Sequence, residues 1–110
     1  MIALNDPVVR TPEPPSAAAQ AVALLTAVAD PIRWAVLAEL ADGKACVCNL
    51  QEHIPIPGNL LSYHLKVLRE AGLVTASRRG RWVDYALADD ARERMATALP
   101  GAARGAETPA

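Results

Sequence analysis

The two cysteines of this 110-residue chain, Cys46 and Cys48, are the side chains with the clearest capacity for chemistry. One intervening residue is too few for an easy structural disulfide, so we expect two free thiols in a reducing compartment. Two thiolates at the start of a helix can converge on one ion, and the helix dipole helps them lose their protons. Soft ions such as arsenite, cadmium, lead or zinc suit these ligands. The pair therefore indicates a soft-ion site or a pair of redox-active thiols.

The two thiols alone do not complete the coordination of an ion, and the sequence has no third cysteine and only two histidines. Three-coordinate arsenic or four-coordinate zinc would need help from Glu52, His53, a second copy of the chain, a terminus or water. His53 follows Cys46 by seven residues, too far to share an ion with it within one straight helix. We expect any contribution of His53 to come from across a dimer or with a different metal, nickel among them.

The second chemical pattern is a basic segment, residues 57–81, which carries five Lys or Arg and one Glu for a local charge of +4. The whole chain has a net charge of −1, so one basic face is balanced by the rest of the molecule. Polar residues are interleaved with leucines in the first part of the segment, and arginines gather in the second. Such side chains reach the base edges and phosphates of DNA. The candidates are Asn59, Ser62, Tyr63, Lys66, Arg78, Arg79 and Arg81.

Caps, breakers and hydrophobic spacing predict the elements that position these side chains. Ser16 is the expected cap of a helix over residues 17–29, and Asp30 before Pro31 starts a second helix that stops near residues 42–43. We expect a short third helix over residues 46–53, ended by two prolines, and a fourth that opens at 58–59 and closes at Gly72. The apolar positions at helical spacing are Val22, Leu25 and Val28, then Ile32, Val36, Leu37 and Leu40, then Leu61, Leu65 and Leu68.

After Gly72 the spacing changes to two short runs rich in Val, Trp, Tyr and Thr, residues 73–77 and 82–87. They flank residues 78–80 (Arg-Arg-Gly), which predicts a hairpin whose tip carries arginines. A last helix is expected over residues 89–99. The expected fold class is mainly α with a β-hairpin wing: a winged helix-turn-helix in the order α-α-α-α-β-β-α.

Residues 61–74 (Leu-Ser-Tyr-His-Leu-Lys-Val-Leu-Arg-Glu-Ala-Gly-Leu-Val) closely resemble the recognition-helix signature of the ArsR/SmtB family of metal- or metalloid-responsive repressors. Residues 30–33 (Asp-Pro-Ile-Arg) and 36–40 (Val-Leu-Ala-Glu-Leu) resemble the second helix of that family, and residues 78–85 resemble its wing. The resemblance implies a homodimeric repressor of double-stranded DNA, bound to an imperfect inverted repeat, whose DNA affinity falls when an ion binds. It also implies that Ser62 and His64 lie on the DNA-facing helix.

The resemblance extends to the inducer site, because residues 45–50 (Ala-Cys-Val-Cys-Asn-Leu) resemble the third-helix motif of arsenic and soft-metal sensors. It implies that Cys46 and Cys48 bind the inducer ion. His53 is a further candidate ligand only on the ligand count given above. A second inducer site of the family lies on the last helix. The acidic residues Asp89, Asp90 and Glu93 have no histidine beside them, so that pattern is absent and only an oxygen-rich site stays open there.

Three functions stay open on this scaffold. The first is a metal- or metalloid-responsive repressor, and the second is a repressor that responds to redox or sulfur chemistry through the same thiols. The third is a DNA-binding co-regulator that has lost direct sensing and works with a separate partner protein, which the missing third cysteine favours. An enzyme is not expected, because neither histidine has a nucleophile and a carboxylate at motif spacing and no glycine-rich phosphate loop occurs.

Composition sets the expected organisation. With 52% hydrophobic residues the chain can form one modest core, which we expect in a single domain over residues 16–99. The proline-rich residues 1–15 and the tail, residues 100–110, are expected to be flexible. We expect no membrane segment and a cytoplasmic location, since no run of about 18 apolar residues occurs and no basic region precedes an apolar one at the N-terminus.

Overall fold

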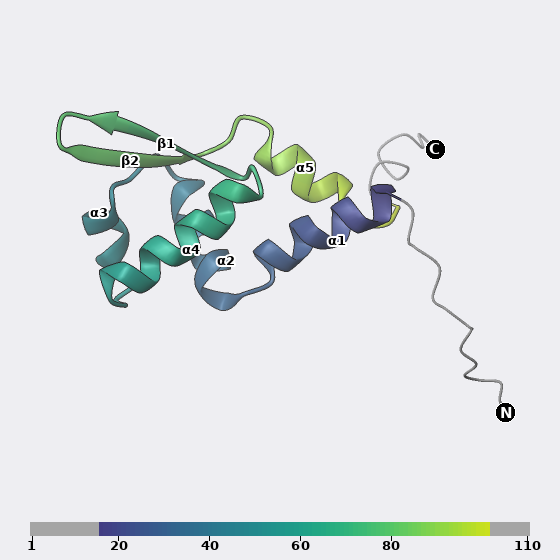
Figure 1. Cartoon of the computed structure of the whole chain (residues 1–110), viewed down its shortest axis with the longest axis horizontal. Coiled ribbons are helices and arrows are strands. Elements are labelled where there is room, and N and C mark those ends of the chain that lie inside the picture. The colour runs from purple at the N-terminus through teal and green to yellow at the C-terminus, as the bar shows by residue number, and fades with distance from the viewer. Residues whose placement is uncertain (1–15, 102–110) are drawn as a thin grey trace, which may run out of the picture.

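The computed structural model describes residues 16–101, and its order of elements confirms the expected winged helix-turn-helix (Figure 1). The expected flexible residues 1–15 lie outside the described residues, as do residues 102–110 of the expected tail. Within the described part, no single helix is long and apolar enough to cross a membrane, and α1 with α2 meets that test only as a pair bent by 86°. The elements are helices α1 (Ser16–Val28), α2 (Pro31–Leu40), α3 (Val47–Gln51) and α4 (Gly58–Glu70), strands β1 (Val74–Arg79) and β2 (Trp82–Leu87), and helix α5 (Ala91–Thr97).

Helix α2 begins as its cap residues predict. Asp30 is extended, and its Oδ1 accepts hydrogen bonds from the backbone N–H of Ile32 at 2.8 Å and of Arg33 at 3.0 Å. Pro31 occupies the first turn, where no intrahelical donor is required. The bond from the backbone N–H of Arg33 is the main reason that the pKa of the Asp30 carboxyl lies below its ordinary value.

The leucine face of α4 forms the centre of the core. Leu61, Leu65 and Leu68 are completely buried, as their spacing predicts. They pack between α2, α3 and the start of the hairpin. The buried cluster consists of Leu24, Val36, Leu37, Leu40, Leu50, Ile54, Leu61, Leu65, Leu68, Leu73, Val74 and Ala91.

Helix α1 buries a face that is shifted from the expected one. Leu24 and Ala27 are buried and Val28 packs against the core, whereas Val22 is 62% exposed. Because most of the helix consists of alanine and other small or apolar residues, several of its faces are similarly apolar and its spacing does not choose among them. In Figure 1, α1 and α5 lie together at the end of the molecule opposite the hairpin tip. Both helices line a shallow groove that includes Leu24 and Ala98.

The wing is an antiparallel hairpin in which Val74 pairs with Leu87 and Arg79 pairs with Trp82. Strand β1 runs two residues further than expected, so its last arginines are in the strand and the turn is formed by Gly80 and Arg81. Gly80 has a φ of +64°, a conformation that suits glycine in a tight turn.

A short bridge joins the segment before α3 to the wing. The backbone N–H of Ala45 donates to the Tyr85 carbonyl at 2.9 Å, and the N–H of Tyr85 donates to the Ala45 carbonyl at 2.8 Å. This pairing holds the chain extended as far as Cys46, so α3 begins at Val47 rather than at the expected residue 46. At its other end α3 stops at Gln51, two residues before the expected end, where the backbone N–H groups of Glu52 and His53 donate to the Asn49 and Leu50 carbonyls in tighter turns.

Candidate DNA-binding surface and thiol site

The outer face of α4 carries the polar side chains expected to contact DNA. Asn59, Ser62, Tyr63 and Lys66 are all exposed, because the buried face of the same helix is the opposite one, formed by Leu61, Leu65 and Leu68. Lys66 lies 3.8 Å from the Glu70 carboxylate, but both side chains are about two-thirds exposed, so water and salt screen this pair. The face therefore offers neutral hydrogen-bonding groups and a weakly paired cation.

His64 is placed differently from the other candidates on this helix. It is only 7% exposed, since helical spacing puts it beside Leu61, Leu65 and Leu68. Its Nδ1 is 3.1 Å from Nη1 of Arg33. A guanidinium only donates hydrogen bonds, so this Nδ1 is the acceptor. His64 was expected among the residues that contact DNA. That expectation is corrected, because its side chain is buried on the core side of α4.

Arg33 connects three elements through its guanidinium. In addition to His64 of α4, its Nε donates to the Ala27 carbonyl at 2.5 Å and its Nη2 to the Thr26 carbonyl at 3.4 Å. These carbonyls belong to the last turn of α1, where no intrahelical donor is available and a cation complements the helix dipole. Arg33 of α2 thus links the end of α1 to α4.

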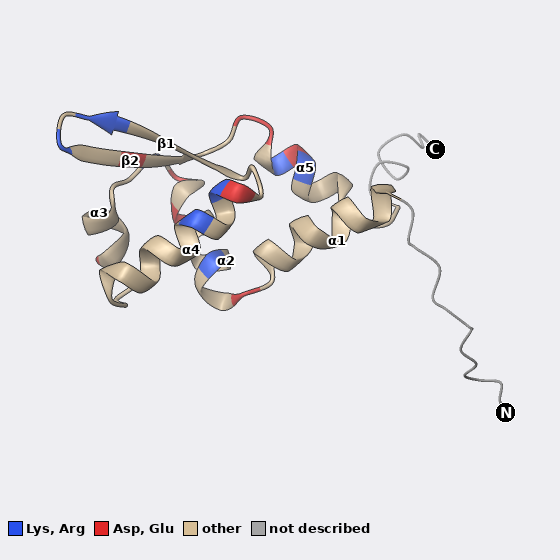
Figure 2. Cartoon of the chain, in the orientation of Figure 1, with Lys and Arg blue, Asp and Glu red and all other residues tan. Residues whose placement is uncertain are grey.

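The wing tip concentrates positive charge, which Figure 2 shows in blue at the end of the hairpin. Arg78, Arg79 and Arg81 are all exposed. Arg79 is different from the other two, because its Nε and Nη2 donate to the Asp84 carboxylate at 2.8 and 3.0 Å. These bonds are the main cause of the lowered pKa of the buried Asp84. The charge of Arg79 is therefore partly neutralised by Asp84 within the wing.

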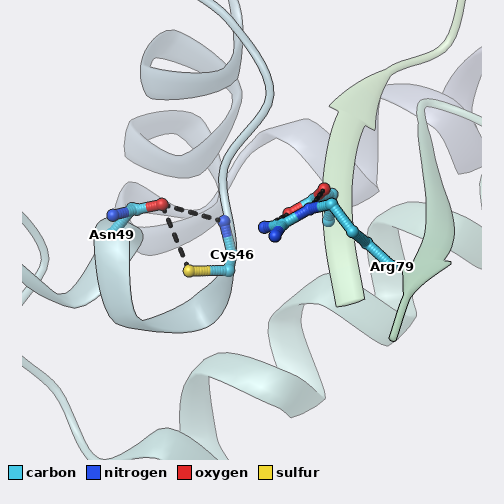
Figure 3. A network of polar contacts seen from close by, with 4 residues as sticks. Cys46, Asn49 and Arg79 are labelled. Carbon is cyan, nitrogen blue, oxygen red and sulfur yellow. Dashed lines mark hydrogen bonds and ion pairs between the residues drawn. The ribbon is translucent and has the colours of Figure 1, made fainter. Parts of the chain in front are cut away.

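Both cysteines have free thiols at the start of α3. Cys46 is half-buried and Cys48 is exposed. The Cys46 thiol donates to Asn49 Oδ1 at 3.1 Å, and the same oxygen accepts the Cys46 backbone N–H at 3.4 Å (Figure 3). In Figure 3 the guanidinium of Arg79 also points toward Cys46 from the wing. The thiols therefore lie beside the hairpin.

The other proposed ligands do not gather around the thiols within one chain. His53 Nδ1 instead lies 3.1 Å from Glu39 Oε1 on α2. In the part of the chain that the structure describes, no three His, Cys, Asp or Glu side chains form a group that could hold a metal. A soft ion would thus have the two thiols as its ligands from this chain.

Several partners in these sites were not found from the sequence. Asp84 could have been found from the hairpin register, because it lies diagonally opposite Arg79, two residues beyond its partner Trp82. The buried position of His64 was available from the leucine spacing of α4. No local pattern indicated the bonds of Arg33 to Thr26 and Ala27, since they depend on the angle between two helices.

Helix α3, the turn that follows it, helix α4 with its exposed polar face, and the arginine-tipped hairpin together define a winged helix-turn-helix protein. Residues 30–76 match the family described as "Bacterial regulatory protein, arsR family". The chain belongs to this family, whose members are regulatory proteins rather than enzymes.

Three relatives illustrate the likeness. The chain is 46% identical over 66 residues to the HTH-type transcriptional repressor SmtB of Mycobacterium tuberculosis, covering 60% of this chain and 49% of that protein. It is 43% identical over 65 residues to the arsenical resistance operon repressor of Bacillus subtilis, covering 58% and 62%. The solved structure of reduced HlyU from Vibrio cholerae has a TM-score of 0.64 at 34% identity and covers 73% of this chain and 82% of that one. The chain thus spans about half the length of the first of these proteins.

Proposed function

We propose that this chain is a sequence-specific DNA-binding repressor that acts as a homodimer in the cytoplasm and leaves its operator when a soft metal or metalloid ion binds Cys46 and Cys48. The observation that carries the proposal is the juxtaposition of three features: the exposed polar face of α4, the arginine-tipped wing, and two free thiols beside that wing.

The α4 face and the wing would contact different parts of the DNA, the base edges and the phosphates. Asn59, Ser62 and Tyr63 are suited to base edges in the major groove, because they offer donors and acceptors on one exposed helical face. Arg78 and Arg81 are suited to the flanking phosphates, where they displace counterions and contribute affinity without regard to sequence. A two-fold dimer would present two such units to an imperfect inverted repeat, since one small unit gives little specific affinity.

The thiol pair supplies the response to the ion. Thiolate sulfur favours soft ions such as arsenite, cadmium or lead, and zinc is a further candidate. Binding requires the Cys46 thiol to lose its proton and its bond to Asn49. Because the bridge from Ala45 to Tyr85 joins this segment to the wing, a shift of Cys46 would move the wing relative to α4. An effector of this kind typically changes affinity by roughly 5- to 150-fold.

A thiol-based redox or sulfur response is the second candidate. It is favoured by the exposure of Cys48 and by the lack of a third ligand in the described chain. The likeness to a solved protein named in its reduced form also supports it. Adjacent thiols of this kind can pass through sulfenic acid without closing an easy disulfide between them.

The test is a DNA-binding titration with an operator selected from random-sequence DNA. The purified chain, kept reduced with a phosphine, is titrated with arsenite, cadmium, zinc and nickel. We expect one of these ions to release the operator from the wild type, and the double variant Cys46→Ser, Cys48→Ser to bind DNA without release. If the serine variant releases DNA at the same ion concentration, the proposed site is wrong. If no ion acts but a mild oxidant does, the redox candidate replaces it. If neither acts, a co-regulator without direct sensing is favoured.

A further inference from the structure

An apolar groove lies between the end of α1, helix α2, the end of β2 and helix α5. It measures about 200 Å³, and its walls include Val28, Trp34, Leu87 and Met95. Trp34 is 63% exposed, more than any other large hydrophobic side chain of the described residues. Arg92 is the only charged residue in the lining. The groove therefore combines an uncovered indole and aliphatic walls with one cation.

The Arg92 guanidinium has donors available for a further partner. In the described part of the chain its side chain makes one long hydrogen bond, from Nη2 to the Ala41 carbonyl at 3.4 Å. Among residues 16–101 it pairs with no carboxylate. A guanidinium carries five N–H donors and stays charged in proteins. An acidic group held beside apolar side chains would therefore complement both the cation and the walls of the groove.

The size of the groove limits what can occupy it. A cavity of about 150 Å³ holds a benzene ring, so this groove takes a few apolar side chains rather than the face of a helix. An extended segment that carries aliphatic side chains near one carboxylate meets these requirements. Residues 2–9 (Ile-Ala-Leu-Asn-Asp-Pro-Val-Val) have this composition, because they are mostly aliphatic and their only charged side chain is Asp6.

The length of chain between residues 2–9 and α1 also fits this groove. Helix α1 has 13 residues, a length of about 20 Å, so the groove at Val28 lies one helix length from Ser16. Residues 10–15 (Arg-Thr-Pro-Glu-Pro-Pro) contain three prolines. Proline-rich segments favour an extended conformation of about 3.1 Å per residue, in which these residues would span about 19 Å. Residues 2–9 can therefore reach the groove of their own chain.

We propose that residues 2–9 dock into this groove of their own chain, with Leu4 and Val8 against Trp34 and the Asp6 carboxylate on the Arg92 guanidinium. The inference goes beyond the proposed function, because it uses neither the thiols nor the DNA contacts. It gives residues 2–9, which their composition predicts to be flexible, a preferred position. Attachment to α1 makes the contact intramolecular, at an effective concentration in the millimolar range, so a weak contact is enough to fill the groove.

The test uses the full chain and two measurements. Nuclear Overhauser effects should connect the methyl groups of Leu4 and Val8 to the Trp34 ring. In a Trp82→Phe background Trp34 is the only tryptophan, and acrylamide should quench its fluorescence poorly because the docked segment covers the indole.

Substitutions in the segment should uncover Trp34 by different amounts. Leu4→Ser should lower the ratio of docked to free segment by at least about tenfold, since a buried leucine is lost, and should increase the quenching of Trp34. Asp6→Asn should lower the same ratio by roughly 1.4- to 5-fold, the range for an exposed ion pair. Glu13→Gln is the matched control, because this carboxylate belongs to the proline-rich residues outside the docked segment. Exchange of the two charges, Asp6→Arg with Arg92→Asp, should restore the docking that either change alone weakens.

Other occupants of the groove give different results. In a mixture of chains with labelled methyl groups and chains with labelled tryptophan rings, contacts between the two labels should be absent, since docking occurs within one chain. If these contacts appear, a second copy fills the groove and the proposal is wrong. If Leu4→Ser leaves the quenching of Trp34 unchanged, the segment does not cover the groove. If Asp6→Asn and Glu13→Gln have equal effects, the pairing of Asp6 with Arg92 is wrong.

Discussion

Replacement of Arg33 by alanine tests whether the recognition helix is held in place from beneath. The change removes the guanidinium bonds to the Ala27 carbonyl at 2.5 Å, to His64 Nδ1 at 3.1 Å and to the Thr26 carbonyl at 3.4 Å. The first two are partly buried, and a hydrogen bond with a charged donor is worth about 1.5–3 kcal/mol. The third is long and exposed and adds little.

Water can reach the freed carbonyls, because the end of α1 is only partly covered, so the two losses do not add in full. We expect the free energy of unfolding to fall by about 2–4 kcal/mol. Arg33→Lys should recover only part of this, since one ammonium cannot reproduce the geometry of the guanidinium. His64 would keep its buried position but lose its donor, which leaves an unpaired acceptor beneath α4.

The assay combines urea unfolding with binding to operator and random DNA at temperatures where each variant is folded. Arg33→Ala should lose discrimination between the two DNAs more than it loses affinity for random DNA, since the wing stays intact. The matched control is Arg92→Ala, which removes a single exposed bond of 3.4 Å to the Ala41 carbonyl. Equal unfolding midpoints for Arg33→Ala and the control, or unchanged discrimination, would refute the role given to Arg33.

The further predictions concern the wing, the recognition helix and the dimer. Asp84→Asn should release Arg79 to the phosphates, so binding to all DNA tightens and the slope of log affinity against log salt steepens by about 0.9, whereas Arg78→Ala should flatten it by a similar amount. The pKa of Asp84 is lowered in the folded chain, so the charged carboxylate stabilises the fold at pH values above its ordinary pKa. This stabilisation is lost as the pH falls through the lowered pKa of the folded chain. Urea unfolding should detect the loss in the wild type and not in the asparagine variant. Ser62→Ala should reduce operator discrimination by roughly 1–3 kcal/mol if it contacts a base, and equal losses on random DNA in a binding titration would contradict that. Val22→Glu places a charge on the exposed face of α1 and should convert the dimer to monomers in light scattering, and a wild type that is already monomeric at micromolar concentration would contradict the proposed dimer.

The sequence by itself determined the order and type of the elements. Asp30 before Pro31 marked the start of α2 and the leucine spacing of α4 marked its buried face, because caps and helical periodicity act within a few residues. The polar face of the same helix and the arginines of the hairpin followed from the same reasoning. Element boundaries do not follow from local spacing where a distant segment of the chain pairs with the element. Helix α3 begins one residue later than expected because the Ala45 pairing with Tyr85 keeps the preceding backbone extended.

Only the tertiary structure decided what the candidate side chains contact. His64 lies in a signature of polar residues, yet it is buried and bonded to an arginine 31 positions earlier in the chain. Arg79 belongs to an arginine cluster, yet the hairpin register gives it the Asp84 carboxylate as a partner. The thiols are two positions apart in the sequence, but they lie beside Trp82 because α3 packs on β2. These contacts join segments far apart in the chain, and their geometry depends on how the helices and the hairpin pack, which local spacing does not encode.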